Sequence, residues 1–142
     1  MTTITHPQGG VSPSKALHVS LWAAQLLLGL LFVFGGLMKT SQPIAELAQK
    51  LVWPGALPEG LVRFIGLSEL LGGLGLVLPS ATRVKPWLTP LAGVGLATIM
   101  LLASLFHLSR GELGVLPMNF ALGGLAAFIA WGRYKKVPIL PR

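Results

Sequence analysis

Residues 61–79, LVRFIGLSELLGGLGLVLP, form an apolar stretch with one carboxylate, Glu69, near its middle. A helix needs about 20 predominantly apolar residues to cross the hydrocarbon of a bilayer, and this stretch is long enough to do so. It lacks the alternation of polar and apolar residues that marks a membrane β-strand. Because an ionisable group at membrane depth is costly, Glu69 is expected to belong to a functional site or to a buried ion pair.

The composition extends this prediction to the whole chain. The 142 residues are 53% hydrophobic and only 11% charged, with a mean hydropathy of +0.74, whereas an ordinary soluble domain carries about 25% charged residues. We predict an all-α membrane protein, a four-transmembrane-helix bundle built from residues 18–133. The predicted helices span residues 18–38, 61–78, 88–108 and 115–132. A flexible cytoplasmic tail, 1–17, is expected before the bundle, and a basic cytoplasmic tail, 134–142, after it.

The connection between the first two predicted helices has an amphipathic pattern of its own. Its apolar residues recur at i, i+3, i+4, i+7 and i+8, and they are Ile44, Leu47, Ala48, Leu51 and Val52. The polar residues between them face the other way, which predicts a short amphipathic helix at the outer surface of the membrane. Such a helix is either a lid over the mouth of the bundle or an interfacial anchor.

The distribution of basic residues predicts the orientation of the bundle. Four helices bring both chain ends to one side. The basic residues of that side are Lys15, Arg83, Lys85, Arg133, Lys135, Lys136 and Arg142, with no acidic residue among them. The other side has the remaining four basic residues, offset by three glutamates. The positive-inside rule therefore predicts a multi-pass protein of the bacterial inner (plasma) membrane with both termini in the cytoplasm.

The basic residues, the lack of cysteine and the spacing of the histidines limit the classes of partner and cofactor. The basic residues form no patch interleaved with aromatic residues, so we expect the lipid bilayer, and no nucleic acid, as a partner. The chain has no cysteine, which excludes thiol–disulfide chemistry by its own residues. His6, His18 and His107 are not at a metal-ligand spacing, and we expect no metal site.

Each predicted helix carries its polar group on the same face as its small residues. In the second helix, the residues at i, i+4, i+7, i+11 and i+14 are Val62, Gly66, Glu69, Gly73 and Leu76. The other helices repeat this spacing. Membrane helices approach one another closely on their small faces, so the polar groups are expected to point into the bundle.

The polar groups also converge in depth. Lys39 and His107 lie at the outer ends of the first and third helices, where Cα–Cβ bonds lean back toward the membrane. The predicted ligand-binding or buried polar cluster consists of Lys39, Glu69, His107 and Asn119, with Gln25 below and Arg63 at the rim. Arg110 and Glu112 are interpreted as ordinary loop charges. The cluster either binds a ligand or a proton, or it only fixes helix packing.

Four segments on these helices resemble the DoxX-like family of small four-helix integral membrane proteins. They are FVFGGLMK (32–39), RFIGLSELLGGLGLVLP (63–79), PWLTPLAGVGLATIMLLASLFHLSRGE (86–112) and MNFALGGLAAFIAWGR (118–133). The resemblance covers residues 18–133, and the family's polar positions correspond to Lys39, Glu69, His107 and Asn119. It implies an association with quinone-linked or oxidative-stress-related membrane redox proteins, or with assembly factors. This chain lacks the cysteines that some redox-associated four-helix relatives use.

Three functions remain open from the sequence. The first is an accessory or binding subunit that holds a lipophilic ligand, a quinone or a lipid, or that supports a membrane oxidoreductase partner. The second is a structural or assembly protein, whose polar cluster only fixes helix packing and whose glycine faces pack against partners or a homo-oligomer. The third is a small transporter or proton pathway. A quinone is the one cofactor considered, and we do not expect stand-alone enzyme activity from this chain.

Overall fold

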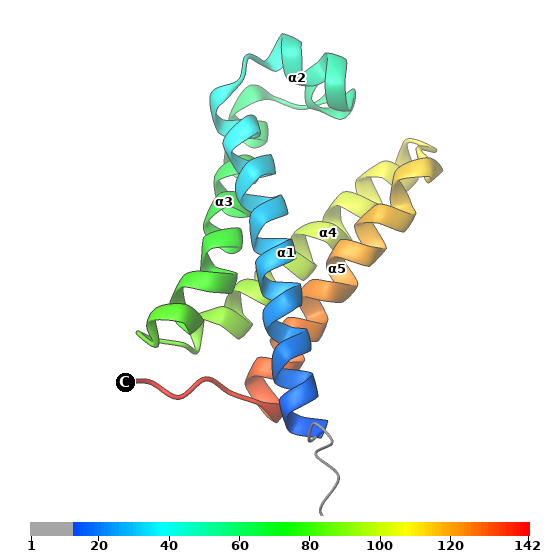
Figure 1. Cartoon of the computed structure of the whole chain (residues 1–142). Helices are drawn as coiled ribbons and strands as arrows, with labels where there is room; N and C mark the ends of the chain where they lie inside the picture. The colour runs from blue at the N-terminus through cyan, green and yellow to red at the C-terminus, as the bar shows by residue number, and fades with distance from the viewer. Residues whose placement is uncertain (1–12) are drawn as a thin grey trace, which may run out of the picture.

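The computed structural model describes residues 13–142, and this part of the chain is helical, without strands (Figure 1). Within these residues, four helical segments are long and apolar enough to cross a membrane. They are α1 (Pro13–Ser41), α3 (Glu59–Thr82), α4 (Leu88–Ser109) and α5 (Leu116–Trp131), the last extended by short helical turns at Leu113–Val115 and Gly132–Lys136. The short helix α2 (Ile44–Leu51) and a 3-10 turn (Trp53–Ala56) connect α1 to α3. The predicted four-helix bundle with a short helix after its first span is confirmed.

The two largest differences from the predicted helix boundaries, at the start of α1 and the end of α3, have local reasons. α1 begins at Pro13, so residues 13–17 are helical although they were assigned to the flexible tail. Proline is favoured at the first position of a helix because its φ angle is already helical and it has no N–H to leave unpaired. The rest of the predicted tail, residues 1–12, lies outside the described residues. α3 continues past Pro79 to Thr82 and stops where Arg83 adopts a left-handed conformation with φ of 59°.

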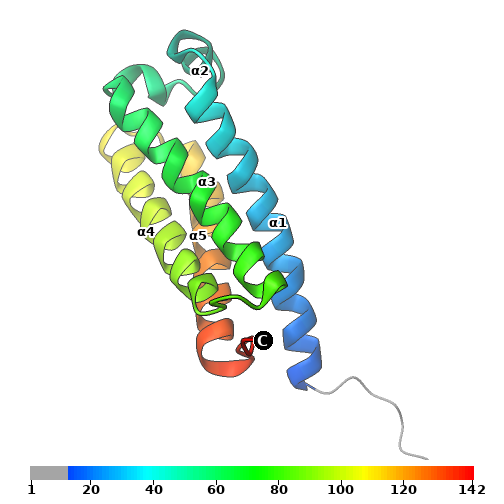
Figure 2. The same cartoon turned by 90° about the vertical axis from the view of Figure 1, so that its left-hand side faces the viewer.

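The four long helices pack as two pairs, α1 with α3 and α4 with α5 (Figure 1). The C-terminus and the start of α1 lie at one end of the bundle and α2 lies at the other (Figures 1 and 2). We refer to these as the C-terminal end and the α2 end. Figure 1 shows the two pairs diverging toward the α2 end.

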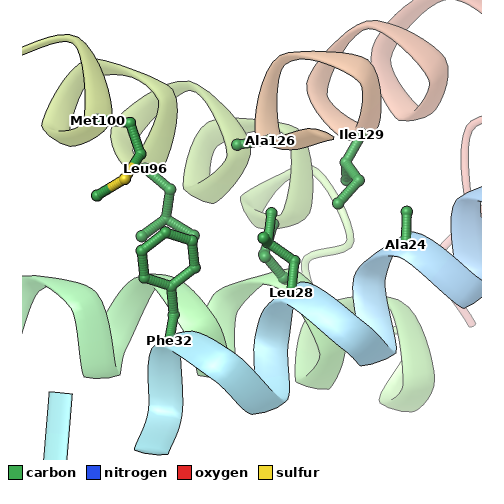
Figure 3. Packing of buried hydrophobic residues seen from close by; sticks show 8 residues of the cluster. Ala24, Leu28, Phe32, Leu96, Met100, Ala126 and Ile129 are labelled. Atoms are coloured by element: carbon green, nitrogen blue, oxygen red, sulfur yellow. The ribbon is translucent and has the colours of Figure 1, made fainter. Parts of the chain in front are cut away.

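The hydrophobic core lies where the two pairs meet (Figure 3). Its buried side chains come from every long helix, and they are Ala24, Leu28, Phe32, Leu76, Leu96, Met100, Ala126 and Ile129. Further contacts between the pairs lie in the C-terminal half. A hydrogen bond of 2.8 Å joins the hydroxyl groups of Ser80 and Thr89, and the α-carbon of Gly132 lies against the side chain of Leu21.

Glycines bring the backbones of α1 and α3 into close contact. A Cβ atom at Gly36 would lie 2.6 Å from the carbonyl oxygen of Gly66, and one at Gly73 would lie 2.9 Å from the carbonyl oxygen of Gly29. A Cβ atom at Gly66 would lie 2.6 Å from Cβ of Lys39. Small residues allow this approach, which increases dispersion contacts between helices where lipid supplies no hydrophobic driving force.

Most residues of the helical faces predicted from the sequence are buried. All five residues of the predicted face of α3, Val62, Gly66, Glu69, Gly73 and Leu76, are buried. The same spacing in α4 predicts a face of Gly93, Ala97, Met100, Ser104 and His107. All of these are buried except Ala97, whose neighbour Leu96 is buried in its place. The α4 face turns slightly because Leu96 fills the space left by Gly72 of α3.

We expect Gly36→Ala to destabilise the protein by about 1–3 kcal/mol, because backbone atoms of α3 cannot move aside as a flexible side chain would. Gly124→Ala is the matched control, since a Cβ atom there meets nothing within 4 Å. Because alanine is favoured over glycine inside a helix, this control should leave stability unchanged or raise it by up to about 1 kcal/mol. Unfolding of both variants in mixed micelles, followed by circular dichroism, measures the difference. Equal stability of the two variants would contradict the close contact of α1 and α3.

Candidate functional site

A cavity with a volume of about 470 Å³ opens between the two helix pairs at the α2 end. Most of its wall is apolar, including Phe32, Phe64 and Phe106. One strongly polar side chain from each long helix also lines it, and these are Lys39 of α1, Glu69 of α3, His107 of α4 and Asn119 of α5. Binding sites for small molecules typically have volumes of about 300–1,000 Å³ and combine apolar walls with a few polar groups. We call this space the α2-end cavity.

Lys39 and Glu69 form an ion pair between α1 and α3. The distance from Lys39 Nζ to Glu69 Oε2 is 2.5 Å, and the side chains are 13% and 6% exposed. One feature of the fold produces this contact, and a second opens the ion pair to the cavity. The glycine contact at Gly36 and Gly66 holds the two backbones together, and the absence of a side chain at Gly35 leaves the pair open to the cavity.

Arg63, which the sequence places at the rim of the cluster, makes its contacts with the end of α1. Its Nη1 donates hydrogen bonds to the carbonyl oxygens of Lys39 (2.8 Å) and Gln42 (2.7 Å). Its Nη2 donates to Glu59 Oε1 at 3.0 Å. The last carbonyl groups of a helix lack partners within it, and a cation is favoured there. Arg63 therefore holds α1 in place above the ion pair and does not line the cavity.

His107 pairs with Glu112 in the loop after α4, and not with Glu69. Its Nδ1 lies 2.6 Å from Glu112 Oε2, and Arg110 Nε donates to Glu112 Oε1 at 2.8 Å. The hydrogen bond with His107, followed by that with Arg110, lowers the pKa of Glu112 below its ordinary value. The carboxylate is therefore ionised at neutral pH and accepts a hydrogen bond from Nδ1–H, which fixes the orientation of the imidazole ring at the cavity wall.

Asn119 has an unused donor at the cavity. Its Nδ2 is buried and has no hydrogen-bond partner within residues 13–142. Leaving a buried polar group unpaired costs about 1–3 kcal/mol, so such a group calls for a physical explanation. An acceptor on a molecule bound in the cavity would satisfy this amide.

Trp53, in the turn after α2, forms part of the cavity wall that the sequence analysis did not assign to the site. Lys39 Nζ lies 5.8 Å from the centre of its ring, a cation–π distance. The apolar face of α2 anchors this turn, since Leu47 is fully buried. The connection between α1 and α3 therefore contributes to the cavity directly.

Gln25 lies apart from the other predicted site residues. It is fully buried in the C-terminal half, where Nε2 donates to the carbonyl oxygen of Leu76 at 2.5 Å and Oε1 accepts from Arg133 Nε at 2.7 Å. It does not line the α2-end cavity. Within residues 13–142, no group of three or more His, Cys, Asp or Glu side chains is arranged to hold a metal ion.

The sequence model of the DoxX-like family matches residues 23–129, which include all four polar residues of the α2-end cavity. The chain belongs to the DoxX-like family. With its four long apolar helices, this DoxX-like protein is a multi-pass membrane protein in contact with the lipid bilayer. Searches of curated proteins and of solved structures found no match.

We expect Lys39→Met to destabilise this DoxX-like protein by about 3 kcal/mol, because it leaves the carboxylate of Glu69 buried without its cation. The double variant Lys39→Met/Glu69→Leu should return to within about 1 kcal/mol of wild type, since no charge then remains buried. The free energy of unfolding in mixed micelles tests both statements. A double variant less stable than Lys39→Met would show that the two residues do not act as a pair.

Proposed function

We propose that the α2-end cavity holds a lipophilic molecule whose polar head carries hydrogen-bond acceptors, such as a quinone or a lipid. The observation that carries this proposal is the unpaired amide of Asn119 in an otherwise apolar cavity. The other polar side chains of the cavity have partners in the protein. Asn119 is therefore the group whose hydrogen bonding a ligand would complete.

The chemistry of the cavity favours acceptor groups on the ligand. Lys39 has three N–H donors, and one of them serves Glu69. The amide of Asn119 supplies another donor on the opposite helix pair. Carbonyl oxygens of a quinone or an ester would accept from both, while the phenylalanines of the wall would contact the ring or chain.

The proposed role is that of an accessory or binding subunit. Glu69 and His107 are groups that can exchange protons, and both line the cavity where they would lie beside a redox-active head group. A membrane oxidoreductase is the partner proposed from the family resemblance. The competing role, in which the polar residues only fix helix packing, has one observation in its favour: Lys39 and Glu69 already satisfy each other.

A variant that fills the cavity without touching the polar residues separates these two roles. Ala103 lines the cavity, and Ala103→Phe should reduce the amount of co-purifying quinone or lipid by at least about fivefold, because the added ring occupies ligand volume. Ala127→Phe is the matched control, on an exposed face of α5. Organic extraction of the purified proteins followed by mass spectrometry gives the ligand content.

A second substitution tests whether Glu69 takes part in binding the polar head of the ligand. Glu69→Gln should also reduce ligand content, whereas Glu59→Gln, an exposed position of the same helix, should not. Equal ligand content in wild type and Ala103→Phe would exclude the cavity as the binding site. If Glu69→Gln lowers thermal stability with no loss of ligand, the packing role is the correct one.

We further propose that the protein lies in a bacterial inner membrane with the C-terminal end of the bundle in the cytoplasm. The support is the excess of basic residues at that end. A C-terminal green fluorescent protein fusion should fluoresce and a C-terminal alkaline phosphatase fusion should be inactive. The reverse result would invert the orientation and place the α2-end cavity near the cytoplasm.

A further inference from the structure

A second cavity, of about 430 Å³, lies at the C-terminal end, opposite the α2-end cavity. Its wall comes from the start of α4 and from the segment after α5, and consists of Lys85, Pro86, Trp87, Pro90, Arg133, Tyr134, Pro138, Ile139 and Pro141. Two of these residues are cationic and none is acidic. The proposed function involves neither this cavity nor its residues.

Arg133 is buried, with 3% of its surface exposed, and its charge has no counter-ion among residues 13–142. Its Nε donates to Gln25 Oε1 at 2.7 Å, and its Nη1 lies 3.0 Å from His18 Nδ1. Nη1 also donates to the carbonyl oxygen of Val137 at 3.0 Å. All three acceptors are neutral, since His18 can only accept from a guanidinium through an unprotonated Nδ1. No carboxylate within residues 13–142 forms an ion pair with Arg133.

One nitrogen of this guanidinium remains unused. Nη2 of Arg133 is buried and has no hydrogen-bond partner within the described part of the chain. A buried charge without a compensating anion is costly, and an unpaired donor adds to that cost. The anion cannot come from the glutamates of this chain, because Glu69 is paired with Lys39 and the other three lie at the α2 end.

The final residues of the chain are hydrogen-bonded to the loop that carries Lys85, the second cation of this cavity. Arg142 N donates to the carbonyl oxygen of Arg83 at 3.3 Å, and Arg83 Nε donates to the carbonyl oxygen of Leu140 at 2.9 Å. These bonds tie the segment after α5 to the loop between α3 and α4, and Lys85 is part of that loop. Figure 1 shows this segment crossing the C-terminal end toward the loop.

We propose that the C-terminal-end cavity binds a phosphate group, carried by an anionic lipid headgroup or present as a free phosphate. Arg133 supplies a planar donor with an unused Nη2, and Lys85 supplies a second positive charge. Guanidinium groups suit phosphate because their N–H donors match the spacing of its oxygens.

The surroundings favour a lipid as the carrier of this phosphate. Trp87 and Tyr134 line the cavity and are 60% and 72% exposed, which is typical of aromatic residues at the interface between membrane and water. Along α4 beyond the cavity, Leu91 and Val94 are exposed on the helix surface. A lipid with its phosphate in the cavity would lay its acyl chains against these residues.

The test measures binding of short-chain phosphatidylglycerol to the purified full-length protein by native mass spectrometry, with diacylglycerol of the same chain length as the probe without phosphate. We expect wild type to bind the first and not the second. Lys85→Gln should weaken binding about fivefold, and Arg133→Gln at least about tenfold. Lys135→Gln, an exposed lysine of the same end that does not line the cavity, should change affinity by less than about twofold.

Addition of inorganic phosphate at millimolar concentration distinguishes a lipid headgroup from a free phosphate as the bound group. Competition with phosphatidylglycerol supports a site for free phosphate, and its absence supports a headgroup site that also needs the lipid chains. If Arg133→Gln fails to fold, Lys85→Gln decides alone, because Lys85 is exposed and its substitution leaves the buried network intact. Equal affinity of wild type and Lys85→Gln, or equal binding of diacylglycerol, would overturn the proposal.

Discussion

The close approach of α1 and α3 at Gly36 and Gly66 constrains the rest of the structure. Backbone atoms of the two helices lie nearly in contact there, and neither glycine can accept a side chain without displacing the other helix. The next turn of α1 then carries Lys39 directly over Glu69 of α3. A carboxylate in an apolar helix thereby gains a cation without recruiting one from α4 or α5. This ion pair needs no residue of α4 or α5. The α4–α5 pair can therefore diverge from the α1–α3 pair and leave the α2-end cavity between them.

The bundle has two dissimilar ends. At the α2 end, acidic and basic groups balance one another in ion pairs, and the space between the helix pairs is lined by groups that both donate and accept hydrogen bonds. At the C-terminal end, the cations outnumber the acidic groups, and a buried guanidinium relies on neutral oxygen and nitrogen atoms. The first arrangement suits an uncharged molecule with a polar head, and the second suits an anion. The proposed ligands differ for this reason.

Helical periodicity was sufficient to predict the four spans and most of their buried faces, and it placed Lys39, Glu69, His107 and Asn119 on faces that line one cavity. These features depend on a repeat of 3.6 residues, which the sequence carries directly. The partners of His107 and Gln25 depend on geometry that the repeat does not encode. Gly111, with φ of 71°, turns the chain back so that Glu112 reaches His107. Arg133 meets Gln25 across 108 residues of sequence because α1 and α5 come together at the C-terminal end. The contact of His107 with Glu112 could have been predicted from a glycine after the helix followed by an acidic residue. No local pattern predicts the contact of Arg133 with Gln25.

The two helix pairs meet in the hydrophobic core and in the C-terminal half and diverge toward the α2 end, and this has a mechanical consequence. Contacts between the pairs, such as Ser80 with Thr89 and Leu21 with Gly132, lie in the C-terminal half. A small rotation of one pair against the other, with this half as the pivot, moves each residue in proportion to its distance from the pivot. The packed core resists compression, so such a rotation would change the width of the α2-end cavity more than the packing of the core. Packing at the C-terminal half would therefore set how wide the α2-end cavity is at the opposite end of the bundle.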